Sequence, residues 1–252
     1  MELACRTEKL GLLLPGGSCR GAFQIGVLQA FKERGIAAEV VAGVSSGSWN
    51  AVAWALDEVH RLEELWLDAL SASFYSKSLR QWATNLSPFN YKWIHKTRSK
   101  FHLDWDLVKN AAVEVVIGVA TFPLMRLKLF SNREHPNVDF FSVVLASNTL
   151  MPFHTLPVRV GTGFYVDGGF ADNAPVHALY EKGCDRVIAV VSRPTDRLHH
   201  KPMRPWGFSY PNDRLALVCP EEPLPLNFND FDPGRLREAI RIGYETGLKA
   251  AI

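Results

Sequence analysis

The chain has 252 residues, which is long enough for one large domain that buries about 70–75% of its unfolded surface. Hydrophobic residues make up 47% and charged residues 21% of the chain, which excludes disordered, collagen-like and coiled-coil proteins. The formal net charge of +2 is too small for a typical nucleic-acid-binding protein. We therefore expect one globular domain over residues 1–252 that does not bind nucleic acid.

Four cysteines are scattered along the chain without the CxxC spacing of a zinc or redox site. We expect neither a disulfide framework nor a metal ion, and a reducing compartment fits this pattern best. The first ten residues, MELACRTEKL, lack the apolar core of a secretory signal. The longest apolar stretch, residues 111–125, is too short to span a bilayer. These features predict a cytoplasmic protein, and they are compatible with peripheral contact with a membrane.

The predicted elements alternate between strands and helices from the start of the chain. A strand at 10–14, a glycine loop and a helix at 22–34 are followed by a second strand-turn-helix unit over 39–56. Two such units in succession predict a mainly parallel sheet with helices on both faces. The further elements that we expect are strands at 113–120, 127–130, 158–160, 164–166, 186–191 and 215–219, helices at 140–148 and 236–251, and a surface loop at 193–213.

Residues 71–110 differ in composition from the rest of the chain. They combine eight aromatic and seven basic side chains with two acidic ones, so this segment carries +5 and the remainder −3. We expect an inserted cap or lid here. Its aromatic and basic residues would suit peripheral contact with a membrane, or the aromatics would pack on the core while the lysines face water. No known motif supports nucleic-acid binding by this segment.

The segment Gly43-Val44-Ser45-Ser46-Gly47 fits the pattern G-x-S-x-G. In a nucleophile elbow, a strand turns sharply into a helix and the serine sits at the bend, while Gly43 and Gly47 remove side chains that would clash. An apolar strand precedes Ser45 and a helix follows it, as the elbow requires. The alternative interpretation is a serine that only caps the helix.

A glycine-rich loop lies between the first predicted strand and helix. It consists of Gly16, Gly17, Ser18, Cys19, Arg20 and Gly21. Backbone N–H groups of such a loop can stabilise an oxyanion during acyl transfer. The residues do not fit a nucleotide-binding fingerprint, because Ser18 replaces a required glycine and no lysine follows Gly21. The alternative is a tight turn without a chemical role.

The segment Asp167-Gly168-Gly169 follows a short apolar strand. A carboxylate at a strand end, next to two small residues, can reach a neighbouring loop and accept the proton of a serine hydroxyl. Burial would have to raise the pKa of Asp167, because an ordinary aspartate is a poor base at neutral pH. The alternative is an ordinary Asp-Gly turn.

These motifs stand in LLLPGGSCRGAFQIGVL, GVSSGSWNA and YVDGGFADNAPV, and together they resemble the patatin-like phospholipase family. The resemblance implies an α/β fold, a three-layer α/β/α sandwich around a mainly parallel sheet. It implies that Ser45 is the nucleophile and Asp167 the base of a dyad without histidine, and that no cofactor is needed. The oxyanion loop would include Gly16, Gly17, Ser18, Arg20 and Gly21, and Arg20 would place an anionic head group or brace the loop. The substrate would be a phospholipid or another acyl ester.

Two other hypotheses remain open at this point. Ser18 stands where the family has a third glycine, and a positive φ there would strain the loop. This departure supports a catalytically weak lipid-binding protein that keeps the fold. The third hypothesis is a hydrolase triad that uses His177 or the pair His199-His200, although we expect these side chains to be exposed.

Overall fold

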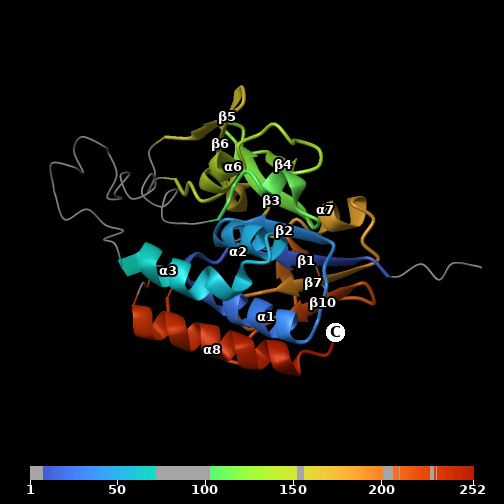
Figure 1. Cartoon of the computed structure of the whole chain (residues 1–252), viewed down its shortest axis with the longest axis vertical. Helices are drawn as coiled ribbons and strands as arrows, with labels where there is room; N and C mark the ends of the chain where they lie inside the picture. Colours follow the sequence, from blue (N-terminus) through green and yellow to red (C-terminus); the bar gives the residue numbers. More distant parts are fainter. Residues whose placement is uncertain are drawn as a thin grey trace, which may run out of the picture.

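The computed structural model describes residues 8–71, 103–151, 156–200, 207–209, 211–227, 230 and 232–252. Most of the expected cap or lid, at residues 72–102, lies outside these ranges. The described residues form a mixed α/β structure around an eight-stranded sheet (Figure 1). This arrangement confirms the fold class that the motifs imply.

The sheet has a parallel half and an antiparallel half. The parallel strands, in the order in which they lie side by side, are β10 (Leu215–Val218), β7 (Arg186–Val190), β1 (Leu10–Leu14), β2 (Val40–Val44) and β3 (Glu114–Thr121). The antiparallel strands are β4 (Leu127–Ser131), β5 (Val158–Val160) and β6 (Gly163–Asp167). Both β4 and β6 pair with β3, which makes β3 the central strand of the molecule.

Alternating residues of the parallel strands build two hydrophobic layers. Leu12 and Leu14 face one layer and Leu13 faces the other, as the two-residue period of a strand requires. The first layer is covered by α1 (Gly21–Glu33), α2 (Ser46–Ala55), α3 (Leu62–Ser71), α6 (Phe140–Ser147) and α8 (Pro233–Lys249). On the second layer, α7 (Val176–Glu181) is the helix that the described part of the chain contributes. Figure 1 shows α1, α3 and α8 lying together on one side of the sheet.

Two glycines allow α1 and α8 to pack backbone against backbone. A Cβ atom added to Gly26 would lie 1.9 Å from the carbonyl oxygen of Ile240, and one on Gly243 would lie 2.0 Å from that of Phe23. No other residue fits at such a crossing. Asp232 caps α8 by accepting a hydrogen bond from the backbone N–H of Arg235 at 2.9 Å.

The remaining elements within the described ranges are short. Four are 3₁₀ helices: η1 (Ser18–Arg20), η2 (Val59–Arg61), η3 (Val108–Asn110) and η4 (Gly168–Phe170). The other two are the paired strands β8 (Leu198–His199) and β9 (Phe208–Ser209). These strands correct the expectation of a plain surface loop at 193–213, because Leu198 is fully buried in the second layer. None of the helices in the described ranges has the length and hydropathy of a membrane-spanning segment.

Candidate active site

Strand β3 brings the ends of two other strands together. β2 pairs with residues 114–118 of β3, and β6 pairs with residues 119–121 along the same edge, because β4 occupies the opposite edge. The two strands therefore lie end to end, with β6 running towards the carboxyl end of β2. Ser45 follows the last residue of β2 and Asp167 is the last residue of β6, so the register of the sheet places these two residues next to each other.

Ser45 occupies the strained bend between β2 and α2. Its φ is 52° and its ψ is −130°, a backbone conformation that side-chain-bearing residues rarely adopt. The close approach of Gly47 makes the bend possible, since a Cβ there would lie 2.0 Å from the carbonyl oxygen of Leu14. Ser45 is partly exposed, whereas Ser46 and Ser48 are buried. Ser45 is therefore the serine of this turn that a ligand can reach.

Ser147 holds the bend, and sequence reasoning did not identify it. Its hydroxyl accepts a hydrogen bond from the backbone N–H of Ser45 at 2.8 Å and donates one to the carbonyl oxygen of Gly118 at 2.8 Å. Ser147 is completely buried on α6. A single serine in an apolar helix carries no signal in the sequence, because its two partners lie on other elements.

Asp167 is buried beside Ser45, with 4% of its surface exposed. Burial raises the pKa of Asp167 to about 6, and hydrogen bonds from the Gly169 backbone N–H and the Ser45 hydroxyl partly offset that rise. The bond from Gly169 measures 2.8 Å. The carboxylate is thus ionised at neutral pH but more basic than an ordinary aspartate, as a proton acceptor for Ser45 requires.

The glycine loop lies against Ser45, and its first peptide group is held at both ends. A Cβ on Gly16 would lie 2.8 Å from the Cβ of Ser45. The carbonyl oxygen of Gly16 accepts a hydrogen bond from Asn173 Nδ2 at 3.1 Å, and the N–H of Gly17 donates one to Ser46 Oγ at 3.0 Å. Asn173 is a second residue that sequence reasoning missed, although it lies within the motif that follows Asp167.

Ser18 stands where the family pattern has a third glycine, and its backbone has a positive φ of 52°. Among the described residues, no acceptor is recorded for the Ser18 N–H, whereas the Gly17 N–H bonds to Ser46. Arg20 contacts the same loop through Nε, which donates a long hydrogen bond of 3.4 Å to the carbonyl oxygen of Gly17. Gly21 begins α1 immediately after the loop.

The histidines that the structure describes do not take part in the Ser45–Asp167 pair. No histidine in the described ranges is hydrogen-bonded to Ser45 or Asp167. His177 is exposed as expected, but His200 is largely buried, with 16% of its side chain exposed. His200 Nδ1 lies 2.9 Å from Asp172 Oδ1, and its Nε2 lies 2.6 Å from Ser209 Oγ. The expectation of an exposed His200 was wrong because the hairpin of β8 and β9 folds back onto Asp172.

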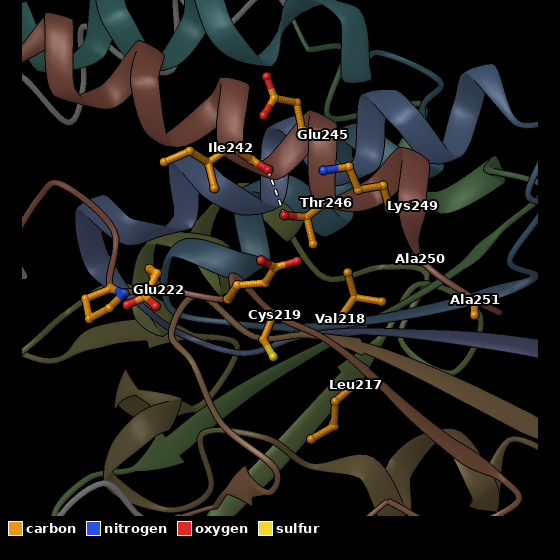
Figure 2. Close-up of a pocket in the computed structure, with 12 residues that line it drawn as sticks. Leu217, Val218, Cys219, Glu222, Ile242, Glu245, Thr246, Lys249, Ala250 and Ala251 are labelled. Carbon is orange, nitrogen blue, oxygen red and sulfur yellow. Dashed lines mark hydrogen bonds between the residues drawn. The ribbon is translucent and has the colours of Figure 1, made fainter.

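A separate cavity of about 450 Å³ opens between β10 and the carboxyl-terminal half of α8 (Figure 2). Its lining includes Val218 and Cys219 from the strand end and Thr246 from the helix, whose hydroxyl donates to the Ile242 carbonyl oxygen at 2.8 Å. None of its lining residues belongs to the Ser45 site. Across the described part of the chain, no group of three or more His, Cys, Asp or Glu side chains could hold a metal ion.

The family model named patatin-like phospholipase matches residues 12–180, a stretch that contains Ser45, Asp167 and the glycine loop. The chain belongs to this family. The neuropathy target esterase sws of Drosophila melanogaster is 26% identical over 193 residues, which cover 73% of this chain and 13% of that protein. The lysophospholipase NTE1 of Coccidioides immitis is 27% identical over 197 residues, covering 73% and 11%. The chain therefore spans a small part of these curated relatives.

Solved structures share the fold of this patatin-like chain. Human GIVD cytosolic phospholipase A2, solved in complex with methyl gamma-linolenyl fluorophosphonate, has a TM-score of 0.57 at 10% identity, with 96% of this chain and 57% of that chain covered. VipD from Legionella pneumophila has a TM-score of 0.52 at 16% identity, with 96% and 66% covered. At these identities the likeness concerns the fold alone.

Proposed function

We propose that this protein is a serine acyl hydrolase that cleaves the ester bond of a phospholipid, a lysophospholipid or a similar acyl ester. The observation that carries the proposal is that the sheet register places Ser45, at its strained bend, next to the buried carboxylate of Asp167, whose pKa burial raises to about 6. Membership of the patatin-like family supports a lipid substrate. The names of the curated relatives, lysophospholipase and neuropathy target esterase, are consistent with the same chemistry.

In the first half of the proposed reaction, Ser45 Oγ attacks the ester carbonyl carbon while Asp167 accepts the hydroxyl proton. Asp167 then passes this proton to the oxygen of the leaving alcohol as the carbon–oxygen bond breaks. In the second half, water attacks the acyl group on Ser45 and gives a proton to Asp167. The fatty acid leaves when Ser45 Oγ takes that proton back.

Oxyanion stabilisation is assigned to the glycine loop in this proposal. Among the residues that the structure describes, the Ser18 N–H has no acceptor, and the Gly17 N–H becomes available when it exchanges Ser46 Oγ for the oxyanion. Loss of one such donor typically lowers kcat by about 100- to 1000-fold. The loop geometry therefore decides whether this chain is a fast or a slow enzyme.

We also propose that the protein takes its substrate from a bilayer surface. Phe122 and Phe164 are 40% and 51% exposed and lie side by side, with the Phe122 N–H bonded to the Phe164 carbonyl oxygen at 2.8 Å. Leu124, in the same turn as Phe122, is 67% exposed. Together with the +5 charge of residues 71–110, these side chains suit a membrane carrying anionic lipid. In a sedimentation assay at low salt, we expect more of the protein to pellet with anionic vesicles than with neutral ones. Equal pelleted fractions would argue instead that the aromatic side chains of residues 71–110 pack on the core.

Intact-mass analysis after incubation with a fluorophosphonate tests the acyl-hydrolase proposal. We expect one adduct, mapped to Ser45, that disappears in Ser45→Ala and is strongly reduced in Asp167→Asn. The matched control is Ser209→Ala, because the Ser209 hydroxyl also lies within hydrogen-bond distance of a possible base, His200 Nε2, at 2.6 Å. An adduct on Ser209 would contradict the assignment of the nucleophile. A folded protein that forms no adduct in detergent would support the lipid-binding alternative without turnover.

A further inference from the structure

His200 attaches the hairpin of β8 and β9 to the segment that follows β6. Its backbone carbonyl oxygen accepts a hydrogen bond from the Asn173 N–H at 2.5 Å. Its ring lies between two side chains, with Nδ1 2.9 Å from Asp172 Oδ1 and Nε2 2.6 Å from Ser209 Oγ. His200 thus holds two consecutive residues of the chain, Asp172 by its ring and Asn173 by its backbone.

The roles of the two ring nitrogens follow from their partners. A carboxylate only accepts hydrogen bonds, so Nδ1 of His200 carries a proton and donates to Asp172. In the neutral ring, Nε2 then accepts a hydrogen bond from the Ser209 hydroxyl. The three side chains contact one another in the order of a hydrolase triad, but Ser209 lies within strand β9, whereas Ser45 occupies the strained bend that exposes a nucleophile. These contacts therefore fit an attachment of the hairpin better than a second nucleophile.

Asp172 is also tied to the sheet on the side of the active site. Its backbone N–H donates a hydrogen bond to the carbonyl oxygen of Gly168 at 2.9 Å. Gly168 packs its backbone directly on β3, since an added Cβ would lie 2.3 Å from the carbonyl oxygen of Gly118. The turn that follows Asp167 is therefore held by the sheet at one end and by His200 at the other.

Asn173 connects this turn to the glycine loop. Its Nδ2 donates to the carbonyl oxygen of Gly16 at 3.1 Å, and a Cβ on Gly16 would lie 2.5 Å from Asn173 Oδ1, so the two residues are in close contact. The same peptide group carries the Gly17 N–H, a proposed donor to the oxyanion. A shift of the Asn173 backbone would change the orientation of this peptide beside Ser45. A displacement of about 1 Å at such a site can cost about 100-fold in rate.

We propose that His200 is a positioning residue for the reaction, which orients the oxyanion loop through Asn173. This inference rests on the proposed acyl-hydrolase function. No hydrogen bond joins His200 to Ser45 or Asp167 in the described part of the chain, so its effect on the reaction passes through the residues that it holds. Loss of the ring contacts should therefore lower kcat, which depends on the loop geometry, and leave KM nearly unchanged.

Two substitutions at His200 separate its two ring contacts. The amide nitrogen of asparagine can take the place of Nδ1 and that of glutamine the place of Nε2, so His200→Asn keeps the donor to Asp172 and His200→Gln keeps the contact with Ser209. We expect His200→Gln to lower kcat for a soluble ester by about 10-fold, with KM unchanged within about 2-fold, and His200→Asn to recover most of the loss. The matched control is His177→Gln, at an exposed histidine whose Nδ1 lies 3.9 Å from the same carboxylate.

A double variant tests whether His200 acts through Asn173. Adding His200→Gln to Asn173→Ala should lower kcat by less than about 2-fold further, because the connection to Gly16 is already absent. Losses that multiply, a rise in KM with unchanged kcat, or an equal loss in His177→Gln would overturn the proposal. Should His200→Gln not fold, Asp172→Ala removes the same contact from the other side, and we expect the same result from it.

Hydrogen exchange separates this inference from the proposed function, since it needs no substrate. Exchange is followed residue by residue by NMR in the unmodified protein, His200→Gln and His177→Gln. The N–H groups of Asn173 and Gly17 are bonded to His200 and Ser46, and we expect both to exchange about 10-fold faster in His200→Gln alone. Unchanged exchange at Gly17 would overturn the positioning role even in an active enzyme. Faster exchange in a protein that hydrolyses no ester would uphold the connection to the loop and remove only the proposed function.

Discussion

The carboxylate of Asp167 is buried next to the Ser45 hydroxyl, and its raised pKa sets the expected pH dependence of kcat/KM. Only the ionised form can accept the Ser45 proton, and the pKa of Asp167 is raised to about 6. We expect kcat/KM for a soluble ester to rise with pH through about 6 and to level off above about 7. A pH–rate profile measures this directly. An inflection near the ordinary aspartate value of about 4 would show that burial does not tune this group.

The same raised pKa predicts that Asp167 destabilises the fold at neutral pH. A carboxyl whose folded pKa lies above its unfolded pKa contributes stability below the unfolded value and loses it as pH rises through the folded value. Asp167→Asn should therefore raise the free energy of unfolding near pH 7, by about 3 kcal/mol at most, and should have little effect near pH 4. Urea unfolding at both pH values measures the difference. Asp196→Asn, at an exposed side chain, should change neither value.

The positive φ of Ser18 predicts an inverted preference for glycine. Ser18→Gly should be more stable than Ser18→Ala by about 1 kcal/mol, because glycine adopts φ 52° without strain. At Ser142, inside α6, the order should be reversed, since alanine is the better helix former. Thermal unfolding of the four variants compares them. The same order at both positions would show that the loop relaxes away from the positive φ.

At the scale of elements, the site is the meeting point of β1, β2 and β6 with their following loops. Each strand positions one motif, and β3 aligns the ends of β2 and β6. Asn173 then ties the loop after β6 to the loop after β1 through the carbonyl oxygen of Gly16. Orientation of the Gly16–Gly17 peptide thus depends on a side chain from a different element.

Asn173→Ala removes this tie and should lower kcat by about 10- to 100-fold, because the N–H groups for the oxyanion lose their orientation. The Michaelis constant should change little, since Asn173 contacts the loop and not the substrate in this proposal. Asn212→Ala, in an exposed turn, is the matched control. Steady-state kinetics with a soluble ester measures both parameters. A rise in KM with unchanged kcat would assign Asn173 to substrate binding.

At the scale of the whole molecule, part of the fold lies beyond the stretch that the family model matches. Residues after 180 supply β7, β10 and α8, and α8 packs against α1 directly behind the glycine loop. The glycine crossing of α1 and α8 therefore connects the end of the chain to the start of the site.

Gly26→Ala tests how far this crossing supports the fold. The added methyl would meet the Ile240 carbonyl oxygen at 1.9 Å, so we expect a loss of about 1–3 kcal/mol of unfolding free energy. Gly234→Ala, on an exposed part of α8, should have little effect or stabilise slightly. Urea unfolding of both variants gives the comparison. Equal stabilities would mean that the helices separate at little cost.

Local patterns in the sequence were sufficient to predict the main elements and to select Ser45, Asp167 and the glycine loop as the residues of the proposed site. Strand and helix periodicity, glycine spacing and turn chemistry depend on residues close together in the chain, so they can be interpreted without contacts. The helix α3 and the hairpin of β8 and β9 were missed, whereas a helix start was expected near His177, where α7 lies. The two-residue strands of the hairpin carry too little periodicity to distinguish them from a loop, whereas α3 was overlooked although Leu62, Leu65 and Trp66 repeat with helical spacing.

Only the tertiary structure decided what surrounds those motifs. Ser147 supports Ser45 from 102 residues away, and Asn173 reaches Gly16 across 157 residues. The burial that raises the pKa of Asp167, the packing of His200 against Asp172 and the contact of Ser192 with Gly17 likewise depend on residues that lie far apart in the chain. The physical reason is that the register of parallel strands is set by the whole hydrophobic core, which no single segment of the chain contains.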